Sequence, residues 1–132
     1  YKISPFQHSK KIILSVGFKL KKGIKTNILH KMKEHKEDRE QKGHYRYPCA
    51  GSVFKNNRSF GNPSGKIIDS LGLKGYTVGN AKIADFHGNI IINTGNACSR
   101  DIKTIVEYTQ KAVYEKYNYK LEPEIQFIGD WD

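Results

Sequence analysis

The first periodic pattern in the chain is an alternation of apolar and polar residues over positions 12–20. Successive side chains of a strand point to opposite faces, so a period of two predicts a half-buried strand here. Lysines flank the segment on both sides, and Gly23 ends it. The alternating apolar positions are Ile12, Leu14, Val16, Phe18 and Leu20.

A helix is predicted over residues 26–41, with Thr26 as its N-cap. Its apolar face is short, and the rest of the segment is almost entirely charged. A run of mixed charges of this kind is typical of a solvated helix face. The apolar positions are Ile28, Leu29 and Met32.

Two further helices have clearer start signals. Asn62-Pro63 combines an N-cap residue with proline at the first helical position, and Gly72 ends the segment. Ser99 begins the strongest helical pattern, with Asp101 in the first turn, where the helix dipole favours a carboxylate. Its apolar repeat is Ile102, Ile105, Val106, Thr109 and Val113.

Short strands are predicted at residues 76–78, 81–84 and 89–93, with glycines supplying the turns, and a last strand at 125–128. Strands and helices interleave irregularly. This order predicts an α+β fold with a small mixed or antiparallel sheet and three main helices.

The composition fits one globular domain. The chain has 132 residues, of which 37% are hydrophobic and 11% aromatic, enough for a core and too apolar for wholesale disorder. No apolar run approaches the roughly 18 residues of a membrane span, so no membrane partner is expected. Cys49 and Cys98 have no metal-ligand spacing and are interpreted as free thiols in a reducing cytosol.

The formal charge of +10 points to an anionic partner or simply to a lysine-rich surface. A nucleic-acid module would place aromatic residues among its basic ones. None lies between Ile24 and Lys42, which weakens that interpretation without removing it.

Candidate chemistry is concentrated in residues 43–61, which read as one long irregular loop of the kind that tends to be functional. Within it, small residues precede Ser52 and allow close backbone approach. No phosphate loop, nucleophile elbow or zinc-protease motif is present. A serine-hydrolase triad would need His44 or His87 to reach Ser52. From the residues alone, Ser52 and Glu124 are candidates for acid–base work on an anionic ligand.

Five stretches, in order over almost the whole chain, resemble UDP-N-acetylenolpyruvoylglucosamine reductases. The resemblance implies an oxidoreductase of peptidoglycan synthesis in the cytoplasm, in which NADPH reduces FAD and the flavin then reduces the enolpyruvyl group of UDP-N-acetylglucosamine enolpyruvate, giving UDP-N-acetylmuramate. The matching stretches are Tyr-Pro-Cys-Ala-Gly-Ser-Val-Phe-Lys-Asn (47–56), Ser-Gly-Lys-Ile-Ile-Asp (64–69), Gly-Leu-Lys-Gly-Tyr-Thr-Val-Gly (72–79), His-Gly-Asn through Asn-Thr-Gly-Asn-Ala (87–97) and Leu-Glu-Pro-Glu-Ile-Gln-Phe-Ile-Gly (121–129).

The same resemblance assigns roles to individual residues. Ser52 matches the family's proton-donating serine, and Glu124 matches its catalytic glutamate. Lys2 stands where the family has its third catalytic residue, an arginine, and it offers a point charge for the enolate without the bidentate fork. Asn56 and Lys42 match substrate contacts.

The resemblance also implies how the chain is divided. Residues 22–121 match the C-terminal substrate-binding domain, residues 1–21 the end of a preceding FAD-binding domain, and residues 122–132 a strand returning toward that domain. FAD and NADPH are therefore not expected to bind this chain well, and the chain alone is expected to be inactive. Segments 1–21 and 122–132 are expected to lack their usual partners, and exposed strand edges invite self-association. The expected partners are the UDP-sugar substrate and the FAD-binding domains, with no nucleic acid. The alternative is a basic module that binds nucleic acid or another polyanion.

Overall fold

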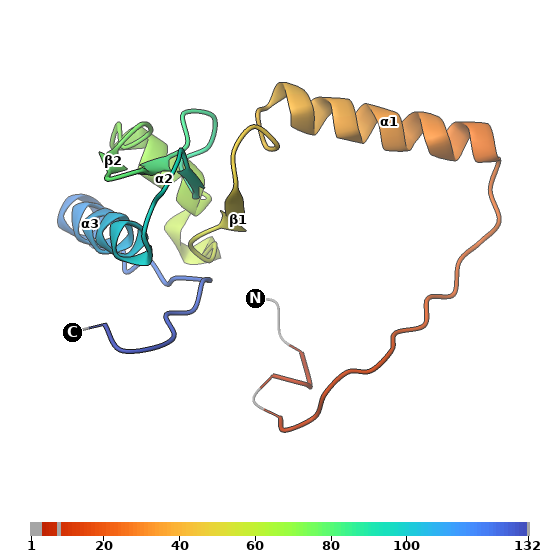
Figure 1. Ribbon diagram of the computed structural model, residues 1–132, viewed down its shortest axis with the longest axis horizontal. Helices are drawn as coiled ribbons and strands as arrows, with labels where there is room; N and C mark the ends of the chain where they lie inside the picture. The colour runs from red at the N-terminus through yellow and green to blue at the C-terminus, as the bar shows by residue number, and fades with distance from the viewer. Residues whose placement is uncertain (1–3, 8, 132) are drawn as a thin grey trace.

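The computed structural model describes residues 4–7 and 9–131, and it consists of a body and a long arm. Figure 1 shows the body at one side, with helices α2 (Ser64–Ser70) and α3 (Ser99–Tyr117) and the sheet, and the arm leaving it through the first helix. The predicted α+β class is confirmed, and the sheet is wholly antiparallel.

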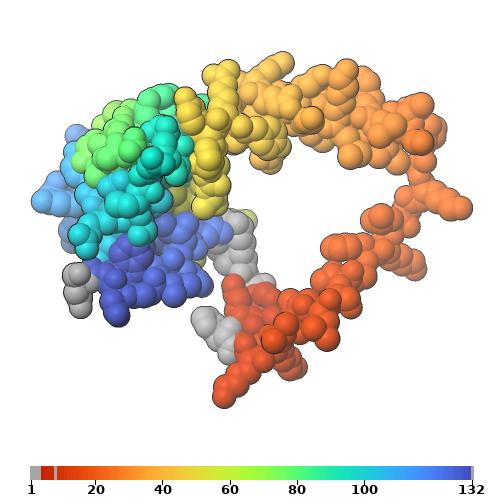
Figure 2. Space-filling view, in the orientation of Figure 1, coloured from red at the N-terminus to blue at the C-terminus, as the bar shows by residue number. Residues whose placement is uncertain are grey.

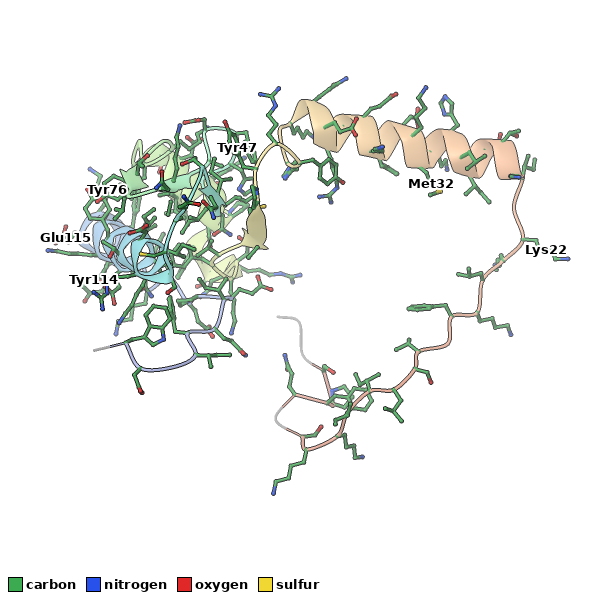
Figure 3. All side chains as sticks on the ribbon, viewed as in Figure 1. Lys22, Met32, Tyr47, Tyr76, Tyr114 and Glu115 are labelled. Atoms are coloured by element: carbon green, nitrogen blue, oxygen red, sulfur yellow. The ribbon has the colours of Figure 1, made fainter. Side chains whose placement is uncertain are left out.

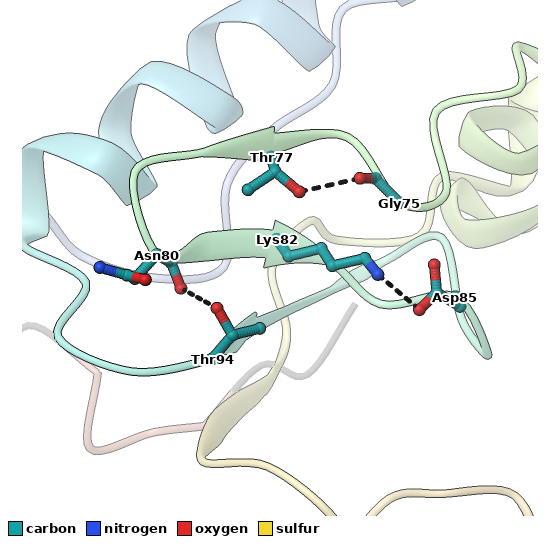
Figure 4. A network of polar contacts seen from close by, with 6 residues as sticks. All are labelled: Gly75, Thr77, Asn80, Lys82, Asp85 and Thr94. Atoms are coloured by element: carbon teal, nitrogen blue, oxygen red, sulfur yellow. Dashed lines mark hydrogen bonds and ion pairs between the residues drawn. The ribbon is translucent and has the colours of Figure 1, made fainter.

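The sheet has four strands in the order β1-β4-β3-β2. Their bounds are Cys49–Ser52 for β1, Thr77–Val78 for β2, Ala81–Ile83 for β3 and Ile90–Asn93 for β4. The predicted strands at 76–78, 81–84 and 89–93 are thus confirmed, with ends that differ by one residue. The short polar segments around β2 and β3 are held by local contacts that Figure 4 shows, including Lys82 Nζ to Asp85 Oδ2 at 2.7 Å and Thr94 Oγ1 to the Asn80 carbonyl at 3.0 Å.

Strand β4 is buried on both faces, which explains its uninterrupted run of isoleucine. Ile91 belongs to the main core with Ile83 and Val106. Ile90 and Ile92 belong to a second, smaller cluster on the opposite face of the sheet. The period of two therefore holds within the strand, and each face has its own apolar layer.

Helices α2 (Ser64–Ser70) and α3 (Ser99–Tyr117) complete the body, with a 3-10 turn, η1, at Arg58–Phe60. Helix α3 packs on β2, β3 and α2 through the predicted apolar face, of which Ile105 and Val113 are fully buried. Cys98, one residue before the predicted Ser99, is the N-cap of α3, and the Asp101 carboxylate accepts the Cys98 N–H at 3.0 Å.

The arm carries the two largest departures from the predicted structure. Helix α1 (Lys25–Gln41) forms as predicted, but it begins one residue before Thr26 and buries none of its residues. Over residues 12–20 the predicted strand is wrong, because a strand needs a partner for its backbone and none of the described residues provides one. The alternating apolar side chains are exposed, as Leu14 at 91% illustrates. Figure 2 shows the arm standing clear of the body over most of its length, and Figure 3 shows Lys22 and Met32 on it.

The C-terminal segment, residues 122–131, also lacks the predicted strand at 125–128. It makes one isolated bridge, between Phe54 and Pro123. Beyond the bridge it packs through side chains: Phe127 meets the Trp131 ring edge-on at 5.4 Å, and Lys103 Nζ lies 5.4 Å from the Trp131 ring centroid. This segment is therefore partly packed against the body. The expectation that it lacks its usual partners, the FAD-binding domains, stays a prediction.

In the described part of the chain, no helix is both long enough and apolar enough to cross a membrane.

Candidate functional site

A β-bulge at the end of β1 determines where Ser52 lies. Cys49 pairs with Ile92 and Ser52 pairs with Ile90, so one extra residue is accommodated on β1. Gly51 adopts a φ of 79° within the bulge, a conformation that costs glycine little and other residues more. Four residues of the predicted irregular loop 43–61 thus form the edge strand, and the sequence pattern failed there because a four-residue strand with glycine has no clear period.

The backbone just after Ser52 is paired on both sides. On one side, the Val53 N–H donates to the Asn89 carbonyl at 2.9 Å. On the other, the Glu124 N–H donates to the Val53 carbonyl at 2.7 Å, and the Lys55 N–H donates to the Glu122 carbonyl at 2.9 Å. The Lys55 ammonium and the Glu122 carboxylate also form an ion pair. Ser52 and Glu124, two of the three predicted catalytic residues, are thereby brought to neighbouring positions from distant parts of the sequence.

A hollow of about 330 Å³ opens beside Ser52. Lys66 gives it a net positive charge, because the second lining cation, Lys74, pairs with the lining carboxylate of Asp69 at 3.0 Å. Ser52 and Asn56 both line the hollow, whereas Glu124 does not. The lining residues are Ser52, Asn56, Pro63, Gly65, Lys66, Asp69, Lys74, Phe86, His87, Gly88 and Asn89.

Asn56 is tied to the start of α2. Its Oδ1 accepts the backbone N–H of Ser64 at 2.9 Å, and the Ser64 hydroxyl donates to the Lys55 carbonyl at 2.7 Å. Ser64 is fully buried. The Asn56 side chain is therefore held on its carbonyl side, and its NH₂ group remains as the donor that a ligand in the hollow can meet.

His87 and Asn89 also line the hollow. From the sequence, His87 is considered only as a possible base for Ser52, and Asn89 is assigned no role. Its Nδ1 accepts the Asn89 N–H at 3.1 Å. Burial, and then the nearby His44, lower the pKa of the His87 imidazole below its ordinary value of 6.5. The neutral ring consequently carries its proton on Nε2 and offers the hollow one donor.

A falling pH is expected to destabilise the chain through His87. Its pKa is lower in the folded state, so its contribution to stability is complete above about pH 6.5 and is lost as the pH falls through the folded-state pKa. The nearby charges of His44 and Lys74 also lower the pKa of His87. The urea midpoint should therefore fall between about pH 7 and about pH 5, and His87→Gln should reduce the slope. His35→Gln, on exposed α1, is the matched control and should leave it unchanged.

Lys42, the other predicted substrate contact, is not brought to the hollow. Lys42 lies at the C-terminal end of α1, with its ammonium 2.7 Å from an Asp38 carboxylate oxygen. The residues that follow it do contact the body, where the His44 and Phe86 ring centroids are 5.3 Å apart. Lys2 is outside the described residues. No hydrogen bond joins a histidine to the Ser52 hydroxyl among the described residues, so the hydrolase reading lacks its base.

Much of the basic charge on α1 is already paired. Cations and carboxylates alternate at a spacing of four residues along the helix, which reduces the net charge that a polyanion would meet. This arrangement weakens the alternative of a nucleic-acid module. The pairs are Lys33–Glu37, Lys36–Glu40 and Lys42–Asp38.

Comparison with known proteins gives a consistent result. Residues 43–128 match the family model described as UDP-N-acetylenolpyruvoylglucosamine reductase, C-terminal domain. Proteins named UDP-N-acetylenolpyruvoylglucosamine reductase are similar over nearly the whole chain: the one from Treponema denticola is 50% identical over 99% of this chain, and the one from Borreliella burgdorferi 46% over 98%. The chain spans 43% of the length of each of these two relatives.

A solved structure agrees in fold. The crystal structure of UDP-N-acetylenolpyruvylglucosamine reductase from Thermus caldophilus matches 82% of this chain with a TM-score of 0.62 and 37% identity, and the match covers 37% of that protein. The matched family model covers the sheet, α2, α3 and the hollow beside Ser52. The chain therefore belongs to the UDP-N-acetylenolpyruvoylglucosamine reductase family and corresponds to its C-terminal domain.

Proposed function

We propose that this chain is the substrate-binding domain of an FAD-dependent reductase that uses NADPH to reduce UDP-N-acetylglucosamine enolpyruvate to UDP-N-acetylmuramate, in the cytoplasm and as a step of peptidoglycan synthesis. The observation that carries the proposal is the joining of Ser52 to Glu124 through the Val53–Glu124 backbone hydrogen bond, beside a cationic hollow. Family membership supports it independently.

The described residues do not fit an FAD site. Their sheet is antiparallel throughout, so it lacks the strand–helix crossover in which a glycine-rich turn holds a dinucleotide pyrophosphate. Flavin and NADPH are therefore assigned to the FAD-binding domains that act with this chain, and the hydride comes from outside it.

The residues of this chain have three roles in the proposal. Lys66, Lys74 and the Asn56 NH₂ group provide charge and donors for the diphosphate and sugar of the substrate. The Ser52 hydroxyl supplies the proton to the carbon next to the one reduced, which is general-acid work that depends on its fixed position. Glu124 acts beside the reacting group, and it helps most when it is protonated or paired with a cation. Lys42 is proposed to make a further contact with the substrate, and Lys2 is proposed to stabilise the enolate.

The exposed arm has a place in the same proposal. The alternating apolar face of residues 12–20 and the apolar positions of α1 lie in solvent here. We assign residues 1–21 to the end of the FAD-binding domain, whose sheet would pair with them. In the isolated chain the same unpaired edges offer a surface to a second copy.

The test is an activity measurement on the longer protein that contains both parts. Purified protein should carry bound flavin and oxidise NADPH only when the enolpyruvyl UDP-sugar is present, and the product should be UDP-N-acetylmuramate. This 132-residue chain alone should show neither property. Flavin-free protein, or NADPH oxidation that does not depend on the UDP-sugar, would contradict the proposal.

A further inference from the structure

The Asn89 side chain lies beside residues 53–55, just after strand β1 ends. The backbone of these residues is still hydrogen-bonded on both sides. Asn89 is 3% exposed and immediately precedes β4. Its Oδ1 accepts the Phe54 N–H at 2.8 Å, and its Nδ2 donates to the Phe54 carbonyl at 2.8 Å. With the Val53 N–H donating to the Asn89 backbone carbonyl, one residue satisfies three backbone groups of the segment that follows Ser52.

The primary amide of Asn89 replaces the peptide group of a neighbouring strand. One donor and one acceptor on the same planar group match the donor and acceptor of Phe54, as a neighbouring peptide would. Because these Phe54 groups are buried, leaving either one without a partner costs more than the bond itself contributes. The side chains closest in shape do not provide both functions: aspartate at neutral pH only accepts, and leucine neither donates nor accepts.

The Asn89 contacts lie between Ser52 and Glu124, two of the predicted catalytic residues. The segment Val53–Lys55 has the Asn89 contacts on one side and residues 122–124 on the other. Ser52 is attached to one end of the segment, and Glu124 is bonded directly to Val53. A shift of Phe54 would move Ser52 and Glu124 relative to each other.

We infer that Asn89 is a positioning residue, which holds Ser52 in register with Glu124 through its paired hydrogen bonds to the Phe54 backbone. The inference rests on the proposed function for its kinetic consequence, but its geometric part can be tested separately. The side-chain oxygen and nitrogen of Asn89 are both hydrogen-bonded to the Phe54 backbone, so its effect passes through that backbone.

The chain provides a matched control at the other end of β4. Asn93 Oδ1 also accepts two backbone N–H groups, from Gly95 at 2.9 Å and Ala97 at 3.2 Å. These bonds hold the turn before α3 and have no link to Ser52. Asn89→Ala and Asn93→Ala therefore remove similar bonds, and only the first acts on the site.

The experiment uses the full-length enzyme. Asn89→Ala should lower kcat for enolpyruvyl reduction by roughly a hundredfold, the size expected for a misplacement of about 1 Å. Flavin reduction by NADPH and the substrate KM should remain near wild-type values. Asn93→Ala should leave kcat unchanged. Asn89→Asp should recover activity as the pH falls, because a protonated carboxyl again provides one donor and one acceptor.

Amide hydrogen exchange gives a readout that needs no activity. The Phe54 amide should exchange faster in Asn89→Ala than in wild type, with α3 amides unchanged. Unchanged exchange at Phe54, or equal losses of kcat in Asn89→Ala and Asn93→Ala, would overturn the inference. An inactive wild-type enzyme would instead count against the proposed function, so the two failures can be told apart.

Discussion

Ser52→Ala is expected to lower the rate of enolpyruvyl reduction in the full-length enzyme by about a hundred- to ten-thousandfold, the range for losing a positioned general acid. Ser52 lies at the end of a bulge and beside the hollow, and alanine keeps that backbone while removing the hydroxyl that is proposed to donate the proton. Reduction of the flavin by NADPH should be untouched, because that step takes place before the enolpyruvyl group reacts.

Stopped-flow kinetics of the two half-reactions would measure this difference directly. Ser59→Ala is a suitable control, since the Ser59 hydroxyl bonds to the Asn57 side chain at 2.8 Å and does not line the hollow. If Ser52→Ala slowed flavin reduction as much as enolpyruvyl reduction, the loss would be one of folding or domain assembly. If neither half-reaction slowed, Ser52 would not be the proton donor.

Gly88→Ala is expected to disrupt the body of the chain. A Cβ at position 88 would lie 2.5 Å from the Gly65 carbonyl oxygen and 3.1 Å from the Asp69 nitrogen. Both are backbone atoms of α2, so relief requires α2 and the loop before β4 to move apart. Overpacking of this kind costs about 1–3 kcal/mol or more, and the movement would also displace His87 and Asn89.

Urea unfolding followed by circular dichroism would measure the loss as a lower midpoint. Gly17→Ala is the matched control, because a Cβ there has nothing within 4 Å and the substitution should be neutral. A Gly88→Ala chain with the wild-type midpoint would show that α2 and the loop are not held as closely as the structure has them.

The parts of the fold that could be predicted are those determined by local patterns. Helix α3 has an apolar repeat with a capping carboxylate, and β4 is an unbroken apolar run between polar residues. Both signals depend on neighbours a few positions away, which a single sequence displays. The resemblance, rather than the pattern, supplied the roles of Ser52 and Glu124.

The parts that could not be predicted depend on partners far away in the sequence. Residues 12–20 have a strand pattern, but pairing requires a second strand that the described residues do not contain. Asn89 reads as an ordinary polar residue before a strand, since its three bonds are made to a segment over thirty positions earlier. His87 was missed for the same reason, because its burial and its contact with His44 exist only after folding.

The two-sided pairing of Val53–Lys55 has a consequence for how the site assembles during synthesis of the chain. More than half of the chain lies between Ser52 and Glu124, so closing this contact carries a large loop entropy and is expected late in folding. The sheet, with Asn89 already bonded to Phe54, can form while the C-terminal residues are still unmade. The segment with Glu124 then pairs last, when the Glu124 N–H bonds to the Val53 carbonyl. A ribosome-bound chain would therefore hold a nearly complete body in which the acid and its carboxylate partner had not yet met.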